Sequence, residues 1–561
     1  MRVTLVLACL FGTISAARIP RVARALASNT TALHGAVSTE VLECSEIGTE
    51  IIRQGGNAAD AMVAGVLCVG VMAPWHSGQG GGGFMLVRSP NGTYETIDFR
   101  ETAPGLANET MYVNNITLSL VGGLAVGTYG EPAGLEALHS RYGQLPWSDL
   151  FQPAINLARN GFRMLPEAYT VVSNPAYSFA LTDPSFAAIY APNGTIRPIN
   201  STLYRPTYAQ TLAEVAAKGS IAMYQGRIAE ATIEAIQRAG GIMTLSDLAN
   251  YSVVSRKPSS VPYHEYTLYS CPAPASGTIA LSAMNILSGY DVSTSSNLNV
   301  STHLITEAMK FAYGQRTVLG DPAFDPNVTA LEAAFLTPRV AGQVRSKLDI
   351  SSTGPATLYD PSNFQVLDDH GTSEMVAATS DGLVISLTTT VNTYFGSQIM
   401  VPSTGVILNN EMNDFSSPGS SNTFGYVPTE ANFVRPFKRP LSSISPTIVE
   451  RNGSFYFTTG AAGGSRITSA TIQVLWHVLD LNATSLQALA APRLHDQIQP
   501  NQTTFEYAYD NRTTAYMSAR GHNVTFVAPG VSIAMAIKAL PNGTYDAASD
   551  PRRVSSGGSV V

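Results

Sequence analysis

The sequence predicts a large mixed fold of the α/β (α+β) class. Its 561 residues are enough for a large buried core, and 45% of them are apolar, as in ordinary globular proteins. Helix-type and strand-type patterns alternate over the first two thirds of the chain and are joined by short turns. No segment of 20 to 50 residues repeats, so a solenoid or propeller is not expected.

Apolar periodicity predicts individual helices within this pattern. The clearest candidates are residues 133–142, 150–160, 228–239 and 304–319. Gly240 and Gly241 follow the third candidate, in the position where glycine commonly ends a helix.

Two further helices predict a disulfide. Residues 44–53 and 58–72 have helical patterns, and Gly55-Gly56-Asn57 interrupts them. Folding back at this turn would bring Cys44 and Cys68 close together. Cys271 would then be a buried free thiol.

The N-terminus has the features of a secretory signal. Arg2 precedes an apolar run over residues 3–17 that ends in Ser15-Ala16-Ala17. An uncleaved membrane anchor is the alternative, although the run is shorter than the roughly 20 residues of a membrane span. We therefore expect residues 1–17 to be a signal peptide and the protein to be secreted, with no membrane anchor. N-x-S/T sequons suggest a glycoprotein and occur at Asn29, Asn91, Asn108, Asn115, Asn193, Asn250, Asn327, Asn482 and Asn523, among other positions.

Charge and motifs exclude several classes of function. The net charge of −7 gives no footprint for nucleic acid. The nine histidines form no ligand cluster in the sequence, and C-x-x-C is absent, so we expect no metal and no cofactor. The run Gly78–Gly83 satisfies G-x-G-x-x-G, but it lies between a helical pattern and a strand-like one, the reverse of a dinucleotide-binding unit.

The most informative change of pattern comes before Thr372. Residues 349–371 are rich in Ser, Thr, Pro and Asp and form either a linker or a functional loop. Two β-favouring runs then flank Asp381-Gly382, which predicts a β-hairpin that starts at Thr372. Cleavage after Gly371 would give Thr372 a free α-amine with a pKa near 8, and this amine could accept the proton of the threonine hydroxyl.

Longer blocks of sequence resemble the γ-glutamyltransferase family of N-terminal nucleophile hydrolases. The blocks occur in the family's order and cover nearly all of the chain beyond the signal. They are residues 44–48, 55–61, 99–104, 145–147, 320–322, 368–372, 390–397, 408–415, 439–447 and 460–464. The resemblance implies a four-layer αββα sandwich built from a large subunit, residues 18–371, and a small subunit, residues 372–561. It also supports the disulfide between Cys44 and Cys68.

The resemblance also assigns the catalytic roles. Thr372 would be the nucleophile in self-cleavage and in catalysis, and Thr390 would hydrogen-bond near its hydroxyl. Gly463 and Gly464 would donate backbone N–H groups to the tetrahedral oxyanion, where glycine permits a close approach of the backbone.

A zwitterion clamp would bind the far end of a γ-glutamyl group. Buried charges need partners of opposite sign, so the α-carboxylate requires cationic and polar donors and the α-ammonium requires carboxylates. The family pattern assigns these roles to Arg100, Ser442 and Ser443 for the carboxylate and to Glu411, Asp414 and Asn392 for the ammonium. Tyr394 is a further substrate-binding candidate.

These residues imply a self-cleaving γ-glutamyltransferase and glutathione hydrolase. Its partners would be glutathione, other γ-glutamyl compounds, and amino acid or dipeptide acceptors. A related acylase or amidase is the enzyme alternative, and a secreted pseudoenzyme is the non-enzyme alternative. One departure supports the latter: Glu374 replaces the histidine that the family commonly has two residues after the nucleophile. The sequence leaves open whether Glu374 faces the site or points away.

Overall fold

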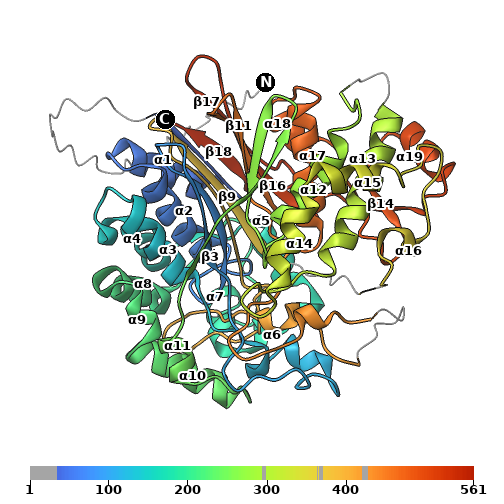
Figure 1. Cartoon of the computed structure of the whole chain (residues 1–561). Coiled ribbons are helices and arrows are strands. Elements are labelled where there is room, and N and C mark those ends of the chain that lie inside the picture. Colours follow the sequence, from blue (N-terminus) through green and yellow to red (C-terminus); the bar gives the residue numbers. More distant parts are fainter. Residues whose placement is uncertain (1–33, 294–297, 363, 365–370, 420–426) are drawn as a thin grey trace, which may run out of the picture. The chain divides into compact units, whose positions relative to one another are not determined.

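Two antiparallel sheets form the centre of the protein (Figure 1). The computed structural model describes residues 34–293, 298–362, 364, 371–419 and 427–561. The predicted signal peptide, Asn29 and residues 365–370 lie outside these residues. The first sheet has seven strands in the order β18-β1-β9-β10-β2-β3-β6. Its strands are β1 (Gly35–Thr39), β2 (Gly82–Arg88), β3 (Tyr94–Phe99), β6 (Val254–Arg256), β9 (Thr372–Thr379), β10 (Val384–Thr390) and β18 (Gly557–Val560).

The second sheet has six strands in the order β17-β16-β12-β11-β8-β7. They are β7 (Ser259–Tyr263), β8 (Tyr266–Ser270), β11 (Thr447–Arg451), β12 (Ser454–Ala462), β16 (Ile533–Ala539) and β17 (Tyr545–Ser549). Strands from both sides of Gly371 therefore contribute to each sheet. Smaller sheets are formed by β4 (Phe162–Arg163) with β5 (Thr202–Leu203), and by β13 (Leu494–His495), β14 (Thr503–Glu506) and β15 (Val524–Val527).

Strand β9 shows why the sheets stack. Its side chains alternate between two faces, and all of them are buried. Met375 and Ala377 belong to the apolar cluster shared with the helices that cover the first sheet. Val376 and Ala378 belong to the cluster that includes the second sheet. A strand that is apolar on both faces lies between a helical layer and a sheet, as the predicted αββα sandwich requires.

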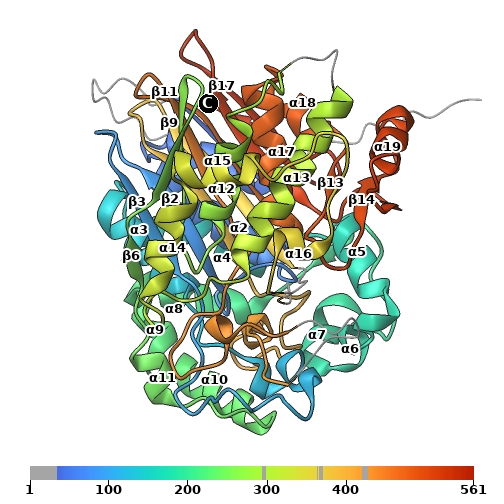
Figure 2. The ribbon, with the colours of Figure 1, turned by 45° about the vertical axis from the view of Figure 1, so that its right-hand side comes forward.

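The two outer layers are helical (Figures 1 and 2). The first sheet is covered by α1 (Leu42–Arg53), α2 (Ala58–Met72) and α3 (Glu131–Tyr142), with α4 (Trp147–Asn160) and α8 (Pro206–Lys218) packed outside α2. The second sheet is covered by α12 (Gly277–Leu287), α17 (Arg466–Leu479) and α18 (Ser485–Ala490), with α13 (Leu298–Arg316) beside α12.

The remaining helices lie around these layers. They are α5 (Pro166–Ser173), α6 (Phe179–Thr182), α7 (Pro184–Tyr190), α9 (Ile221–Tyr224), α10 (Arg227–Arg238), α11 (Leu245–Ala249), α14 (Asn327–Phe335), α15 (Pro338–Arg345), α16 (Ala356–Tyr359) and α19 (Asn511–Ser518). No helix within the described residues is both long and apolar enough to span a membrane.

The helices predicted from periodicity are present, with ends that differ by a few residues. The structure has α3, α4, α10 and α13 at the four predicted places. The predicted disulfide is also present: Cys44 of α1 is bonded to Cys68 of α2, with Cα atoms 5.4 Å apart. Asn57 caps α2 and its side chain accepts two backbone hydrogen bonds, which fixes the turn between the helices. Cys271 is a buried free thiol, as expected.

Candidate active site

The nucleophile corner is formed by Gly371, Thr372, Thr390 and Asn392. Thr372 begins β9 and pairs directly with Thr390, the last residue of β10. The predicted hairpin is therefore correct, with its turn at Ser380–Gly382. The two threonine Oγ1 atoms are 3.4 Å apart. Thr390 Oγ1 also donates to the Gly371 carbonyl at 2.7 Å and accepts from the Asn392 N–H at 2.8 Å.

The backbone at Gly371 requires glycine. Its φ is +125°, in the region that L side chains rarely adopt. A Cβ there would lie 2.4 Å from the carbonyl oxygen of Asn392. The carbonyl just before Thr372 is therefore held by its own backbone geometry and by the Thr390 hydroxyl.

A cavity of about 240 Å³ opens at Thr372. It contains the predicted residues Thr372, Tyr394 and Gly463. The lining residues are His76, Tyr177, Gly371, Thr372, Tyr394, Ala462, Gly463, Gly530, Val531, Ile533 and Arg553. The cavity therefore brings together segments from both predicted subunits, next to the nucleophile corner.

Gly463 and Gly464 form the turn between β12 and α17. Both have positive φ, +125° and +60°, and a Cβ on Gly463 would lie 2.4 Å from the Val531 carbonyl. The turn leads into the N-terminus of a 14-residue helix. The partial positive charge of that terminus favours a developing anion, as an oxyanion site requires.

Sequence reasoning missed His76 and its partners. His76 Nδ1 lies 2.7 Å from a carboxylate oxygen of Glu40, and its Nε2 lies 3.3 Å from an Arg553 nitrogen. Since Arg553 can only donate, Nε2 accepts and Nδ1 donates to Glu40. Burial lowers the pKa of His76 despite the nearby Glu40 carboxylate. The three residues come from distant parts of the chain, so spacing gave no signal.

The predicted clamp residues meet around Arg100. Its side chain is 1% exposed, and one terminal nitrogen donates to Asp414 at 2.5 Å. The other terminal nitrogen forms an ion pair with Glu411. A third carboxylate, that of Glu101, lies 4.0 Å away. The sequence placed Glu101 beside Arg100 in the family motif, but its charge was not assigned to the clamp.

Burial changes the protonation of these carboxyl groups. It raises the pKa of Glu411 well above its ordinary value, against the opposing effect of Arg100. Burial likewise raises the pKa of Glu101 to about 8. Two of the carboxyl groups beside Arg100, those of Glu411 and Glu101, therefore have raised pKa values.

The other predicted clamp residues lie nearby but face their own backbone partners. Arg100 Nε donates to the carbonyl of Pro440, two residues before Ser442. Ser442 Oγ accepts from the Ile444 N–H at 3.2 Å, and Ser443 is 2% exposed. Asn392 Nδ2 donates to the Asn410 carbonyl, and its Oδ1 has no hydrogen-bond partner.

The sequence match to a known family decides the classification. The family model described as Gamma-glutamyltranspeptidase matches residues 44–560. The chain belongs to the γ-glutamyltranspeptidase family. A glutathione hydrolase proenzyme of Arthroderma benhamiae is 44% identical over 542 residues, covering 94% of this chain and 93% of the relative. A glutathione hydrolase of Aspergillus flavus is 42% identical, covering 94% and 89% of the two chains.

Solved structures agree with the fold of this γ-glutamyltranspeptidase family member. The cephalosporin acylase of Bacillus halodurans matches with a TM-score of 0.80 at 23% identity, covering 97% of this chain and 99% of the acylase. The γ-glutamyltranspeptidase of Helicobacter pylori matches with a TM-score of 0.53 at 30% identity, covering 56% of this chain and 91% of the other. The αββα sandwich is thus the N-terminal nucleophile hydrolase fold that the resemblance implied.

Glu374, which departs from the common family pattern, lies between the two sheets. It is on the same face of β9 as Thr372, but it is fully buried and does not line the cavity. Ser386 Oγ and Thr388 Oγ1 donate to its carboxyl at 2.9 and 2.5 Å. Gly460 provides the space, since a Cβ there would lie 2.4 Å from the Glu374 carboxyl. Burial raises the pKa of Glu374 well above its ordinary value.

The glycine run has a packing role in this family member. Gly81 and Gly83 lie against β10, and a Cβ on either would lie 2.0–2.1 Å from the carbonyl oxygens of Thr390 and Thr388. The last two glycines of the run, Gly82 and Gly83, begin β2, and the run packs against β10, which pairs with Thr372.

Three possible metal ligands from two distant segments of the sequence lie together in the structure. His303, Glu307 and His522 place one ligand atom each within 4.8 Å of one another. The sequence did not predict this cluster, because His522 lies more than 200 residues from His303 and Glu307. His303 Nδ1 and His522 Nε2 already share a hydrogen bond at 2.8 Å, and Lys310 Nζ lies 3.3 Å from Glu307. These contacts tie the two histidines to each other and Glu307 to Lys310.

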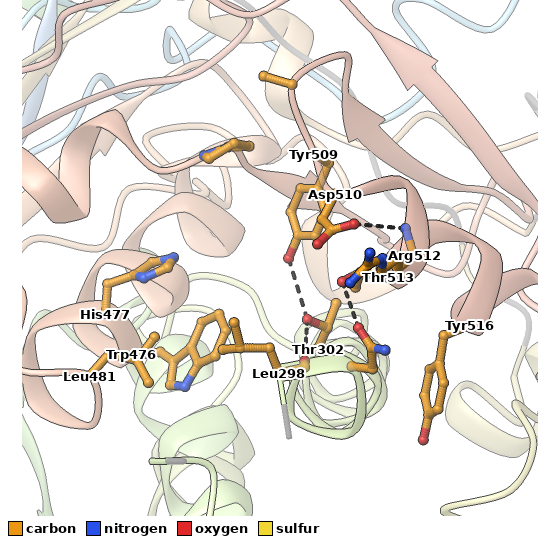
Figure 3. A pocket seen from close by; sticks show the side chains of 13 residues that line it. Leu298, Thr302, Trp476, His477, Leu481, Tyr509, Asp510, Arg512, Thr513 and Tyr516 are labelled. Carbon is orange, nitrogen blue, oxygen red and sulfur yellow. Dashed lines mark hydrogen bonds between the residues drawn. The ribbon is translucent and has the colours of Figure 1, made fainter. Parts of the chain in front are cut away.

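A larger cavity, of about 520 Å³, lies between α13, α17 and α19 (Figure 3). Figure 3 shows Trp476, Tyr509 and Tyr516 around it. None of the predicted site residues lines it.

Proposed function

We propose that this protein is a γ-glutamyltransferase and glutathione hydrolase that activates itself by cleavage between Gly371 and Thr372. The observation that carries the proposal is the nucleophile corner. A threonine begins a strand immediately after a glycine with a positive φ, and the carbonyl of this glycine accepts a hydrogen bond from a second threonine. Membership of the family and the glutathione hydrolase names of two relatives support the substrate class.

Self-cleavage starts with attack of Thr372 Oγ1 on the carbonyl carbon of Gly371. The Thr390 hydroxyl, which donates to that carbonyl oxygen, stabilises the negative charge that develops there. Collapse of the tetrahedral intermediate breaks the C–N bond and leaves Gly371 as an ester on Thr372. The proton of the attacking hydroxyl passes to the departing nitrogen, so the α-amine of Thr372 is free once this bond breaks. Water then hydrolyses the ester, which releases the Gly371 carboxylate and restores the Thr372 hydroxyl.

The same hydroxyl then acts on the substrate. The α-amine of Thr372 accepts the hydroxyl proton as Oγ1 attacks the γ-carbonyl carbon of a γ-glutamyl amide. Backbone N–H groups of Gly463 and Gly464 stabilise the oxyanion. The leaving amine, such as cysteinylglycine, departs with a proton and leaves a γ-glutamyl ester on Thr372. Water or the amine of an amino acid or dipeptide acceptor then takes the γ-glutamyl group. The cycle uses no cofactor.

The clamp selects the γ-glutamyl group. The α-carboxylate binds Arg100 with Ser442 and Ser443, and the α-ammonium binds Glu411 and Asp414 with Asn392. Within the chain, Arg100 is paired with Glu411 and Asp414. Substrate binding therefore exchanges these internal ion pairs for pairs with the ligand, and Tyr394 contributes to the wall of the cavity.

The mature enzyme consists of residues 18–371 and 372–561, held together by their shared sheets, after removal of residues 1–17. Secretion accords with the apolar N-terminal run and the disulfide between Cys44 and Cys68. The sequons give a glycosylated extracellular protein.

Denaturing gel electrophoresis of the expressed protein tests the proposal. We expect two chains in place of one, and N-terminal sequencing of the smaller should read Thr-Ser-Glu-Met-Val. The processed protein should release glutamate from glutathione. An intact chain without this activity would favour the pseudoenzyme. Processing followed by hydrolysis of a simple acyl amide, with no action on γ-glutamyl amides, would favour the acylase alternative.

A further inference from the structure

A separate cavity of about 320 Å³ lies beside the first turn of α8. It is enclosed by α7, by the start of α8, and by the loop that contains Met400 and Gly405. No residue that lines it also lines the cavity at Thr372. The proposed reaction therefore gives this cavity no role.

Arg205 is a buried cation in the wall of this cavity. It is 3% exposed, and its terminal nitrogens donate to the carbonyls of Gly70 at 2.6 Å and Gly405 at 3.0 Å. Its guanidinium carbon lies 4.1 Å from the centre of the Tyr208 ring. Its Nε, by contrast, has no hydrogen-bond partner.

Arg205 also lacks a counterion within the described part of the chain. No carboxylate there lies within 4.0 Å of it, whereas buried Arg88 and Arg493 are paired with Glu450 and Asp550. Gly70 belongs to the last turn of α2, so the partial negative charge of that helix end offsets part of the charge. A buried charge that dipoles alone compensate favours a bound anion.

The first turn of α8 adds donors on the same cavity wall. Pro206 occupies its first position, and no side chain caps the helix. The N–H groups of Thr207 and Tyr208 form no hydrogen bond with any residue that the structure describes. Such N–H groups at a 13-residue helix form a ready site for an anion.

We propose that this cavity binds a small oxyanion, a carboxylate or a phosphate, through Arg205 and the first turn of α8. Ser185 and Thr207 line the cavity and supply hydroxyl groups for the remaining oxygens. The volume accommodates a phosphate ion or the carboxyl end of a small metabolite.

The site lies behind the substrate cavity. Ser185 and Ala188 of α7 face the oxyanion cavity. Phe186 and Tyr190 of the same helix contact Phe395, with ring centroids 5.4 and 5.9 Å apart. Phe395 follows Tyr394, which lines the cavity at Thr372. A bound oxyanion would therefore stabilise the loop that carries Tyr394.

Thermal unfolding of the full chain at constant ionic strength tests the proposal. Inorganic phosphate and acetate are titrated separately. We expect at least one to raise the unfolding midpoint saturably, by about 2 °C or more. Saturation by phosphate alone, by acetate alone or by both defines the oxyanion that the site accepts. The absence of a saturable shift with either ion overturns the proposal.

Substitutions at Ala188 and Arg205 test whether the ion-induced shift comes from this cavity. Ala188→Glu places a tethered carboxylate at the exposed mouth of the cavity, so it should reduce the ion-induced shift at least threefold, and the isosteric Ala188→Gln should retain it. Arg205→Met should abolish the shift. Exposed Arg227, which has Glu214 as its partner, provides the control, and Arg227→Met should leave the shift unchanged. An equal shift in Ala188→Glu and Ala188→Gln overturns the proposal. This binding test requires neither processing nor activity, so its failure would leave the proposed enzyme intact.

Discussion

The nucleophile corner and the clamp differ in whether their groups are already arranged as the proposed reaction requires. In the corner, neutral hydroxyl and backbone groups are already aligned, with Thr390 bonded to the carbonyl of Gly371. In the clamp, Arg100 contacts Glu411 and Asp414, so the groups proposed to bind the substrate are paired with one another. Under the proposed function, the nucleophile corner is arranged before the substrate binds, whereas the clamp must exchange its internal ion pairs for pairs with the substrate.

The largest effect should come from removing the nucleophile. Thr372→Ala should abolish processing and lower kcat by at least about 10⁴-fold, because the hydroxyl serves both reactions. Thr372→Ser should retain both at lower rates. Gel electrophoresis and glutamate release from glutathione measure the two effects. Normal processing of Thr372→Ala would remove Thr372 from the cleavage mechanism.

Loss of the second threonine should mainly slow self-cleavage. Thr390→Val removes the hydroxyl that donates to the Gly371 carbonyl, and loss of one oxyanion donor costs roughly 10²–10³ in rate. The half-time of processing in purified precursor measures this. Thr390→Ser should restore much of the rate, and equal rates in Thr390→Val and wild type would contradict the role.

Changing the cation of the clamp should affect binding more than chemistry. Arg100→Lys replaces a planar fork of donors with a point charge, so KM for a γ-glutamyl amide should rise roughly 10- to 100-fold, with a smaller change in kcat. Steady-state kinetics on the processed enzyme measures the split. An unchanged KM would place the carboxylate site elsewhere.

The third carboxyl group of the clamp should make stability depend on pH. The pKa of Glu101 is raised to about 8, so the folded chain holds a proton that the unfolded chain has released above pH 4.5. Stability from this group is therefore present at low pH and declines as the pH rises from about 4.5 to 8. Glu101→Gln should flatten that decline in the unfolding midpoint of the Thr372→Ala precursor. The same slope in both proteins would contradict the assignment.

The smallest effect should come from Glu374. It lies between the sheets and does not line the cavity, so Glu374→Gln should change kcat/KM by less than about 3-fold. Ser386 and Thr388 can hydrogen-bond an amide as well as a carboxyl group. A large loss of activity with normal processing would show that the charge at this position reaches the substrate.

Local patterns predicted local structure well. Helices α1 and α2, the turn between them and the disulfide followed from periodicity and from Gly55-Gly56-Asn57. The hairpin followed from Asp381-Gly382, because the turn and the strands are encoded within about 20 residues. The stacking of two sheets between helical layers came only from the family resemblance, and the order of the strands was not predicted.

Long-range contacts explain what the sequence did not reveal. Glu40, His76 and Arg553 come together from three loop segments that are far apart in the sequence, so no local spacing links them. The sequence also did not predict that Arg100 pairs with Glu411 and Asp414. Residues of opposite charge can bind a zwitterionic ligand or can bind one another, and the sequence does not distinguish the two. The side on which Glu374 packs depended on the glycine at position 460, on the opposite sheet.

The shared sheets have a consequence for refolding. Each sheet contains strands from both sides of Gly371, and the proposed cut falls at the first residue of β9, an interior strand of the first sheet. Before the cut, the chain brings all strands together at a fixed effective concentration; afterwards, the two pieces must find each other by diffusion. Recovery from denaturant should therefore be independent of protein concentration for the precursor and should depend on it for the mature enzyme. Self-cleavage would thus leave an enzyme that refolds less readily from dilute solution than its precursor does.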